Sequence, residues 1–176
     1  MESQIIESTA ALRALAEYWD DLWQRSGETV PTMRAELLAQ WIDQFSADQE
    51  FRAIAVWNEG KLVAGLPLVN RKVGRLINAA AMPANRWSPF AALLFDETAR
   101  ADALDELVSA FEQLPWSVLW LDGVNESLSW QAFRPSLSRA GMTTVFHERF
   151  QLTEIPIADD CQPTQNARST NTRQNI

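Results

Sequence analysis

The chain has 176 residues, enough for one ordinary domain, and 47% of them are hydrophobic, so a substantial core can form and disorder of the whole chain is excluded. The net charge of −8 disfavours nucleic-acid binding, which needs clustered Lys and Arg. A single cysteine excludes an internal disulfide framework, and no signal-peptide pattern or membrane-spanning apolar run occurs. We therefore expect a soluble, cytoplasmic protein with no nucleic-acid partner.

The N-terminal residues predict a strand followed by two amphipathic helices. The strand covers residues 3–8. Apolar residues then recur at helical spacing through 8–27 and again through 28–48. Each stretch has one apolar face, which we expect to pack on a sheet.

Local signals mark the ends of these two helices. Ser8 or Thr9 can cap the first, because a side-chain oxygen there accepts an unpaired backbone N–H, and Gly27 ends it. Thr32, with Glu36 one residue beyond the capping-box position, marks the start of the second.

The stretch "WNEGKLVAGLPLV" predicts a β-hairpin. Alternating residues 51–57 form its first strand, 58–61 its turn, and 62–73 its second strand. Pro67 has no N–H to donate, so it belongs at a sheet edge or a bulge. Residues 75–84 predict a further short strand.

The second half predicts alternating helices and strands, with Pro135 kinking or dividing one of the helices. Here the sequence predicts a loop and strand over 85–96, a helix over 97–114, a buried strand over 116–124, a helix over 126–141 and a strand over 142–157. The order favours the α/β (α+β) class, with a mixed, mainly antiparallel sheet and helices on both faces.

The residues after 158 differ from the rest. Residues 159–176, which include Cys161, are mostly polar, rich in Thr, Asn and Gln, and without periodicity, so we expect a disordered tail behind a domain covering 1–158. This tail is either an ordinary frayed terminus or the mark of a longer protein that was cut or frameshifted. Cys161 has no neighbouring activating partner, so we do not expect it to act as a nucleophile.

The order of elements resembles the GNAT acetyltransferase fold. The stretches "LAEYWDDLW", "LLAQWIDQF", "VWNEGKLVAGLPLV", "NRWSPF" and "LWLDGV" are similar, in order and spacing, to the N-terminal half of CelD/BcsL-type acetyltransferases. The resemblance covers roughly residues 5–158. It implies acetyl-CoA as cofactor, tandem GNAT halves, and a link to cellulose or exopolysaccharide production.

The sequence departs from the family in its cofactor signature. The pattern Gln/Arg-x-x-Gly-x-Gly/Ala lets backbone N–H groups at a helix start hold the pyrophosphate of CoA. None of the six glycines here has that spacing. In a tandem protein the working cofactor site would then lie in the second half.

Six residues are candidates for the chemistry. His147, the single histidine, and Glu148 could accept a proton, but neighbours on a strand face opposite sides, so an edge-strand role for His147 is favoured. Asp122 ends a predicted strand, where ligand crevices occur, although a turn-forming role before Gly123 is favoured.

The remaining candidates lie in the "NRWSPF" loop. Arg86 could pair with an acidic substrate group, and Trp87 could stack on a sugar beside the Ser88 hydroxyl. The favoured alternative is a turn fixed by Pro89 whose aromatic residues cover the core edge. No metal-ligand spacing occurs in the sequence.

Two functions remain open at this point. The first is an acyltransferase domain, incomplete without a second GNAT half, that acts on a small molecule or a sugar or envelope precursor. The second is a non-catalytic GNAT-like module that binds a partner or substrate. An exposed sheet edge in a half-protein would also favour a homodimer.

Overall fold

A computed structural model describes residues 1–74, 76–85, 88, 91–99, 101–122, 124, 127–145 and 147. The chain divides into two units, Met1–Thr144 and Val145–Ile176. In the second unit only Val145 and His147 are described; both are exposed and lie outside helices and strands. Everything that follows on the fold concerns the first unit.

The centre of the first unit is a mixed sheet in the order β1-β2-β3-β4-β6, with β5 paired to β3. Its strands are β1 (Glu2–Ile6), β2 (Phe51–Asn58), β3 (Lys61–Val73), β4 (Ile77–Ala81), β5 (Leu94–Phe95) and β6 (Leu119–Trp120). All pairs are antiparallel except β4 with β6. The predicted mainly antiparallel sheet is confirmed.

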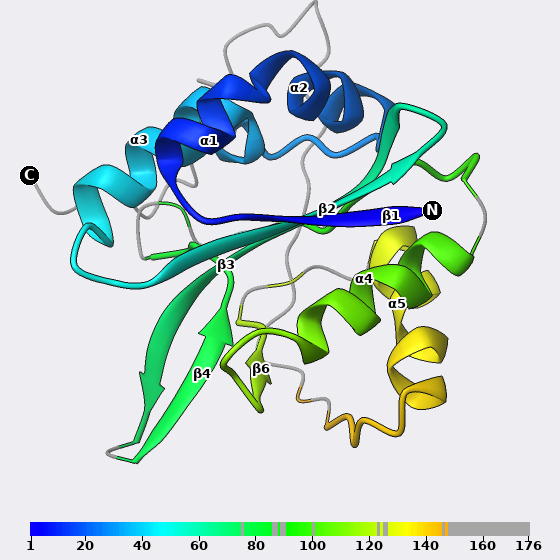
Figure 1. Cartoon of the computed structure of the whole chain (residues 1–176). Coiled ribbons are helices and arrows are strands. Elements are labelled where there is room, and N and C mark those ends of the chain that lie inside the picture. Colours follow the sequence, from blue (N-terminus) through cyan, green and yellow to red (C-terminus); the bar gives the residue numbers. More distant parts are fainter. Residues whose placement is uncertain are drawn as a thin grey trace, which may run out of the picture. The chain divides into compact units, whose positions relative to one another are not determined.

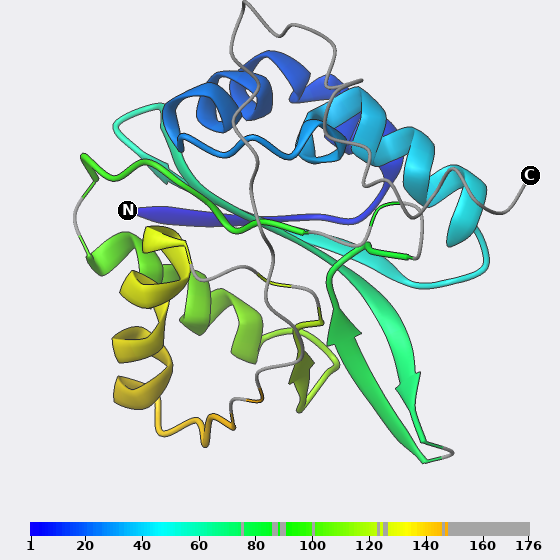
Figure 2. The ribbon, with the colours of Figure 1, turned by 180° about the vertical axis from the view of Figure 1, so that it is seen from behind.

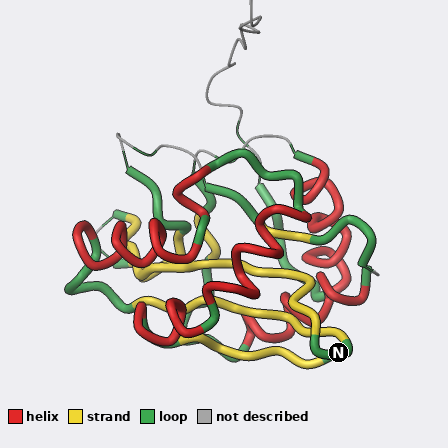
Figure 3. Tube along the Cα trace, turned by 90° about the horizontal axis from the view of Figure 1, so that it is seen from above, coloured by secondary structure: helices red, strands yellow, loops and turns green. Residues whose placement is uncertain are grey.

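Helices cover both faces of this sheet, as predicted (Figures 1 and 2). One layer holds α1 (Thr9–Ala14), α2 (Ala16–Arg25), the 3₁₀ turn η1 (Pro31–Met33) and α3 (Ala35–Phe45); the other holds α4 (Asp102–Glu112) and α5 (Leu128–Arg139). Figure 3 shows these helices and strands from above.

The first predicted helix is interrupted at Leu15, which separates α1 from α2. Ser8 caps α1 as predicted, because its Oγ accepts the Ala11 N–H at 3.1 Å. Leu12 and Trp19, on either side of the interruption, are both fully buried. Each of the two short helices thus contributes a large apolar side chain to the core.

The predicted capping box of the next helix is wrong. α3 begins after Arg34, which gives no side-chain cap, and the cap comes from α2: Asp20 Oδ1 accepts the Ala35 N–H at 2.8 Å. The other Asp20 oxygen pairs with the Arg34 guanidinium at 2.8 Å. Thr32 instead lies 3.0 Å from Ser88, hydroxyl to hydroxyl.

The predicted hairpin is confirmed, with Asn58 opposite Lys61 and positive φ at Glu59 (51°) and Gly60 (78°). Such dihedrals belong to the tight turns that match strand twist. Further along β3, a Cβ added at Gly65 would lie 3.1 Å from the Trp19 ring. Gly65 thus lets the buried indole pack against the strand backbone.

Pro67 lies where the outer side of β3 changes partner. Val69 of β3 pairs with Ala81 of β4, whereas Gly65, four residues earlier in β3, pairs with Leu94 of β5. The chain therefore leaves the sheet after β4 and returns as β5, with Pro67 between the two pairings. This agrees with the prediction of an edge or bulge position.

Three expectations in the second half are corrected. The predicted buried strand over 116–124 is reduced to β6, and Trp120 is 44% exposed because β6 is the last strand in the order. The strand predicted within 85–96 is only β5. Pro135 lies inside α5 without dividing it.

The last predicted strand, 142–157, is wrong where it can be judged. Residues 142–145 and His147 are not in a strand. Residues 148–157 and the predicted tail lie outside the described residues.

The cap of α3 gives a stability prediction. Replacing Asp20→Ala leaves the Ala35 N–H without its acceptor, so the free energy of unfolding should fall by about 1 kcal/mol. Urea denaturation followed by circular dichroism measures this. Glu17→Ala, an exposed carboxylate on the same helix, is the control. Equal effects of the two substitutions would contradict the capping role.

Candidate functional site

The structure describes three of the six candidate residues. Ser88 closes a tight turn with Asn85: its N–H donates to Asn85 Oδ1 and its C=O accepts the Asn85 N–H, both at 2.9 Å. Asp122, which follows β6, lies 3.7 Å from the Arg71 guanidinium of β3. His147 is exposed and belongs to the other unit. Arg86, Trp87 and Glu148 lie outside the described residues.

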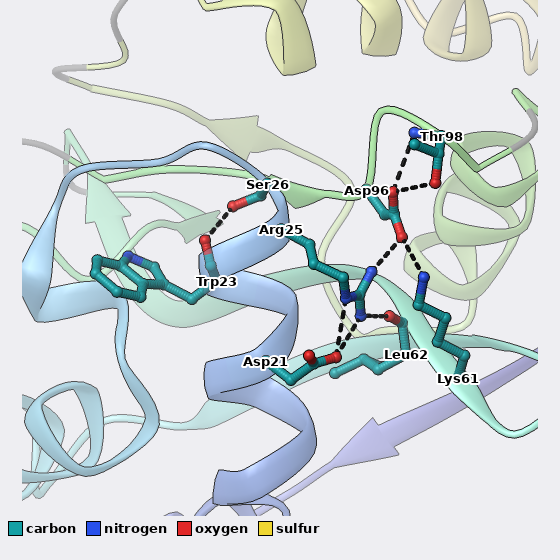
Figure 4. A network of polar contacts seen from close by, with 8 residues as sticks. All are labelled: Asp21, Trp23, Arg25, Ser26, Lys61, Leu62, Asp96 and Thr98. Carbon is teal, nitrogen blue, oxygen red and sulfur yellow. Dashed lines mark hydrogen bonds and ion pairs between the residues drawn. The ribbon is translucent and has the colours of Figure 1, made fainter.

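The most densely connected polar group lies at the turn between β5 and α4 (Figure 4). Its centre is Asp96, which is 3% exposed. Its carboxylate accepts hydrogen bonds from Arg25 of α2 and from Lys61 Nζ at 2.9 Å, at the start of β3. Arg25 also donates to the Leu62 carbonyl at 2.7 Å. One carboxylate therefore joins a helix, the central hairpin and the turn.

The turn itself closes on the same residue. Asp96 Oδ1 accepts the Thr98 N–H at 3.0 Å and the Thr98 hydroxyl at 2.6 Å, and the Asp96 carbonyl accepts the Ala99 N–H at 2.8 Å. The backbone donors of Thr98 and Ala99 are thus used inside the turn.

The ionisation of Asp96 is set by two opposing effects. Burial by itself would raise its pKa, but the hydrogen bonds from Thr98 and Lys61 and the charge of Arg25 outweigh it and hold the pKa at about 2. The group is therefore a carboxylate at neutral pH and serves as a fixed, fully bonded negative charge.

A second polar group, which the sequence did not suggest, lies where the loop after α2 meets the start of α5. Burial raises the pKa of Glu28, and the Ser127 hydroxyl partly opposes this. Trp130 Nε1, three residues further along α5, is buried and meets no hydrogen-bond partner in the described part of the chain. Glu28 and Ser127, which are far apart in the sequence, are thus neighbours at this point.

Comparison with known proteins places the fold. No protein-family model and no curated protein matches the sequence. A solved probable acetyltransferase superposes with a TM-score of 0.53 at 14% identity, over 91% of this chain and 100% of that one. An aminoglycoside acetyltransferase from an uncultured soil metagenomic sample, solved with sisomicin, gives 0.51 at 15% identity, over 86% and 96%.

The chain has the GNAT acetyltransferase fold. The same aminoglycoside acetyltransferase solved with trehalose gives the same TM-score, 0.51. In the GNAT fold of this chain, α4 carries the crossover from β5 to β6, which lies parallel to β4. The turn before α4 is thus the point where a strand end meets a helix start, the usual place for a phosphate in such units.

The described residues of that turn do not fit the pyrophosphate of acetyl-CoA. A phosphate group needs free N–H donors and neighbouring positive charge. Here the N–H groups of Thr98 and Ala99 are taken by Asp96, and the first turn of α4 carries Asp102 and Asp105. The N–H donors of Thr98 and Ala99 are therefore not free for an incoming anion.

The residues that the structure describes show neither a membrane span nor a metal site. No helix there is long and apolar enough to span a membrane. Nor does that part of the chain contain a group of three or more His, Cys, Asp or Glu placed to bind a metal.

The lowered pKa of Asp96 predicts how stability depends on pH. Because the pKa is about 2 in the fold and 3.8 ordinarily, the stabilisation of about 2 kcal/mol is present above pH 3.8 and is lost as the pH falls toward 2. Asp96→Asn should therefore lower the free energy of unfolding at pH 7 by at least that amount and remove this acid-dependent step.

Urea titrations at pH 7, 4, 3 and 2 measure both effects. Asp21→Asn is the matched control, since it removes an exposed carboxylate from the same Arg25. If the free energy of unfolding falls equally steeply below pH 4 in the wild type and in Asp96→Asn, this assignment is contradicted.

Proposed function

We propose that this chain is a GNAT-type acyltransferase domain of the CelD/BcsL kind, which serves acyl transfer to an amine or hydroxyl of a sugar or envelope precursor. The observation that carries the proposal is the parallel pairing of β4 with β6 through the α4 crossover. This pairing turns an antiparallel meander into the sheet of the acetyltransferase fold. The similar aminoglycoside acetyltransferase was solved in complex with sisomicin, which makes an amino sugar a suitable first probe.

Glu28 is the proposed proton acceptor of the acceptor-binding region. A half-buried carboxyl whose pKa is raised toward the working pH is suited to take a proton from an amine. The Ser127 hydroxyl, which lies beside Glu28 and partly opposes the rise in its pKa, would help to orient this carboxyl. Roles in binding for Arg86, Trp87, Ser88 and Asp122, and in proton transfer for His147 and Glu148, remain predictions.

The domain is also proposed to be the N-terminal half of a tandem pair, with residues 1–158 as the GNAT-like unit and the following residues as an irregular segment. The closed turn before α4 supports this arrangement, because acetyl-CoA would then be held by the second half. Sequencing the gene beyond codon 161 tests it. A second GNAT-like half with the glycine signature is expected; the lack of one in every reading frame would contradict the tandem arrangement.

The closed turn also favours a second candidate function, a GNAT-like module that binds a partner or substrate without CoA chemistry. In that case the region around Glu28 would no longer take part in acyl transfer. A homodimer that covers the edge of the sheet would suit either function. The acetyltransferase identity of the similar structures weighs in favour of the first.

Amino-sugar binding tests the first function without any cofactor. Isothermal titration with glucosamine and with sisomicin at pH 7.5 should show binding of at least one of them. Glu28→Gln should weaken that binding about tenfold or more, because a hydrogen bond to a charged group contributes about 1.5–3 kcal/mol. Failure of the wild-type protein to bind either ligand would contradict an acceptor-binding role.

Two controls separate binding from stability. Glu17→Gln, an exposed carboxylate, should leave the affinity unchanged. The melting temperature of Glu28→Gln at pH 7.5 should equal or exceed that of the wild type. The reason is that a carboxyl with a raised pKa destabilises the fold as the pH rises through its titration range.

A further inference from the structure

Asp96 occupies the position that an anionic ligand would take at the strand-to-helix turn. We infer that its carboxylate is a built-in anion that closes this turn, so that this domain holds no acyl-CoA pyrophosphate there. The inference rests on the proposed function, since it states that the domain serves the acceptor side of the reaction and not the cofactor side.

The bonding of Asp96 carries the argument. The carboxylate gathers the kinds of group that bind a phosphate: a guanidinium from Arg25, an ammonium from Lys61, and a backbone N–H and a hydroxyl from Thr98. Such a set of donors would suit a bound phosphate if no protein anion lay between them. Here the Asp96 carboxylate takes that place, so the donors are already hydrogen-bonded.

Displacement of this carboxylate by a ligand would be costly. The Asp96 side chain is only 4% exposed, so moving it aside breaks all four contacts and leaves a charge without partners. These four contacts and the burial therefore hold the carboxylate in the turn.

Removal of the internal charge should open the turn. In Asp96→Asn and Asp96→Ala, the Arg25 and Lys61 cations remain beside the Thr98 N–H with no carboxylate between them. Isothermal titration with inorganic pyrophosphate at low ionic strength should show at least tenfold tighter binding than in the wild type. Asp21→Asn changes the net charge equally outside the turn and should bind pyrophosphate as weakly as the wild type.

The wild-type protein is tested directly with CoA and pyrophosphate. Amide spectra of ¹⁵N-labelled protein should show no shift of the Thr98 or Ala99 signals with either ligand at millimolar concentration. Micromolar CoA binding that pyrophosphate competes away would overturn the inference. So would folded Asp96 variants that bind pyrophosphate no better than Asp21→Asn. If circular dichroism shows that both Asp96 variants are unfolded, the wild-type titration still decides.

The outcome is separable from that of the proposed function. Amino-sugar binding with no CoA binding supports both. CoA binding at this turn overturns the closure while leaving the acyltransferase proposal intact. Absence of amino-sugar binding contradicts the acceptor role. The closed turn is then still tested by the pyrophosphate and CoA titrations.

Discussion

The buried carboxylate of Asp96 is the contact on which both the fold and its interpretation depend. It joins Arg25 at the end of α2, Lys61 at the start of β3 and Thr98 before α4, three segments that lie far apart along the chain. A buried charge is tolerated only when it is paired and hydrogen-bonded, and Asp96 meets both conditions. The helix layer on one face and the crossover helix on the other are thereby tied to the same strand.

This tie has a chemical consequence. The N–H, guanidinium and ammonium groups that bind this internal anion are not free for a phosphate ligand. A half-buried carboxyl, Glu28, lies beside the Ser127 hydroxyl at the start of α5. Together these features support the proposal that this acetyltransferase fold holds an acceptor while acyl-CoA is bound elsewhere.

Local patterns predicted most of the first half of the fold. The hairpin around Asn58–Lys61 follows from alternation and turn chemistry, the Ser8 cap from its side chain, and the position of Pro67 from its missing N–H. The sequence could not reveal contacts between distant residues: the Asp20 cap of α3, the Asp96 cluster, or the pairing of Glu28 with Ser127. Trp120 was expected to be buried because its stretch is apolar, but strand order places β6 last.

The titration of Asp96 tests the central claim most directly. The carboxyl ¹³C shift of Asp96, followed by NMR from pH 7 downward with and without acetyl-CoA, reports its ionisation and its surroundings together. The account predicts a pKa of about 2 that acetyl-CoA leaves unchanged. A pKa near the ordinary 3.8, or a shift of the Asp96 signal on addition of acetyl-CoA, would contradict a turn closed by its own carboxylate.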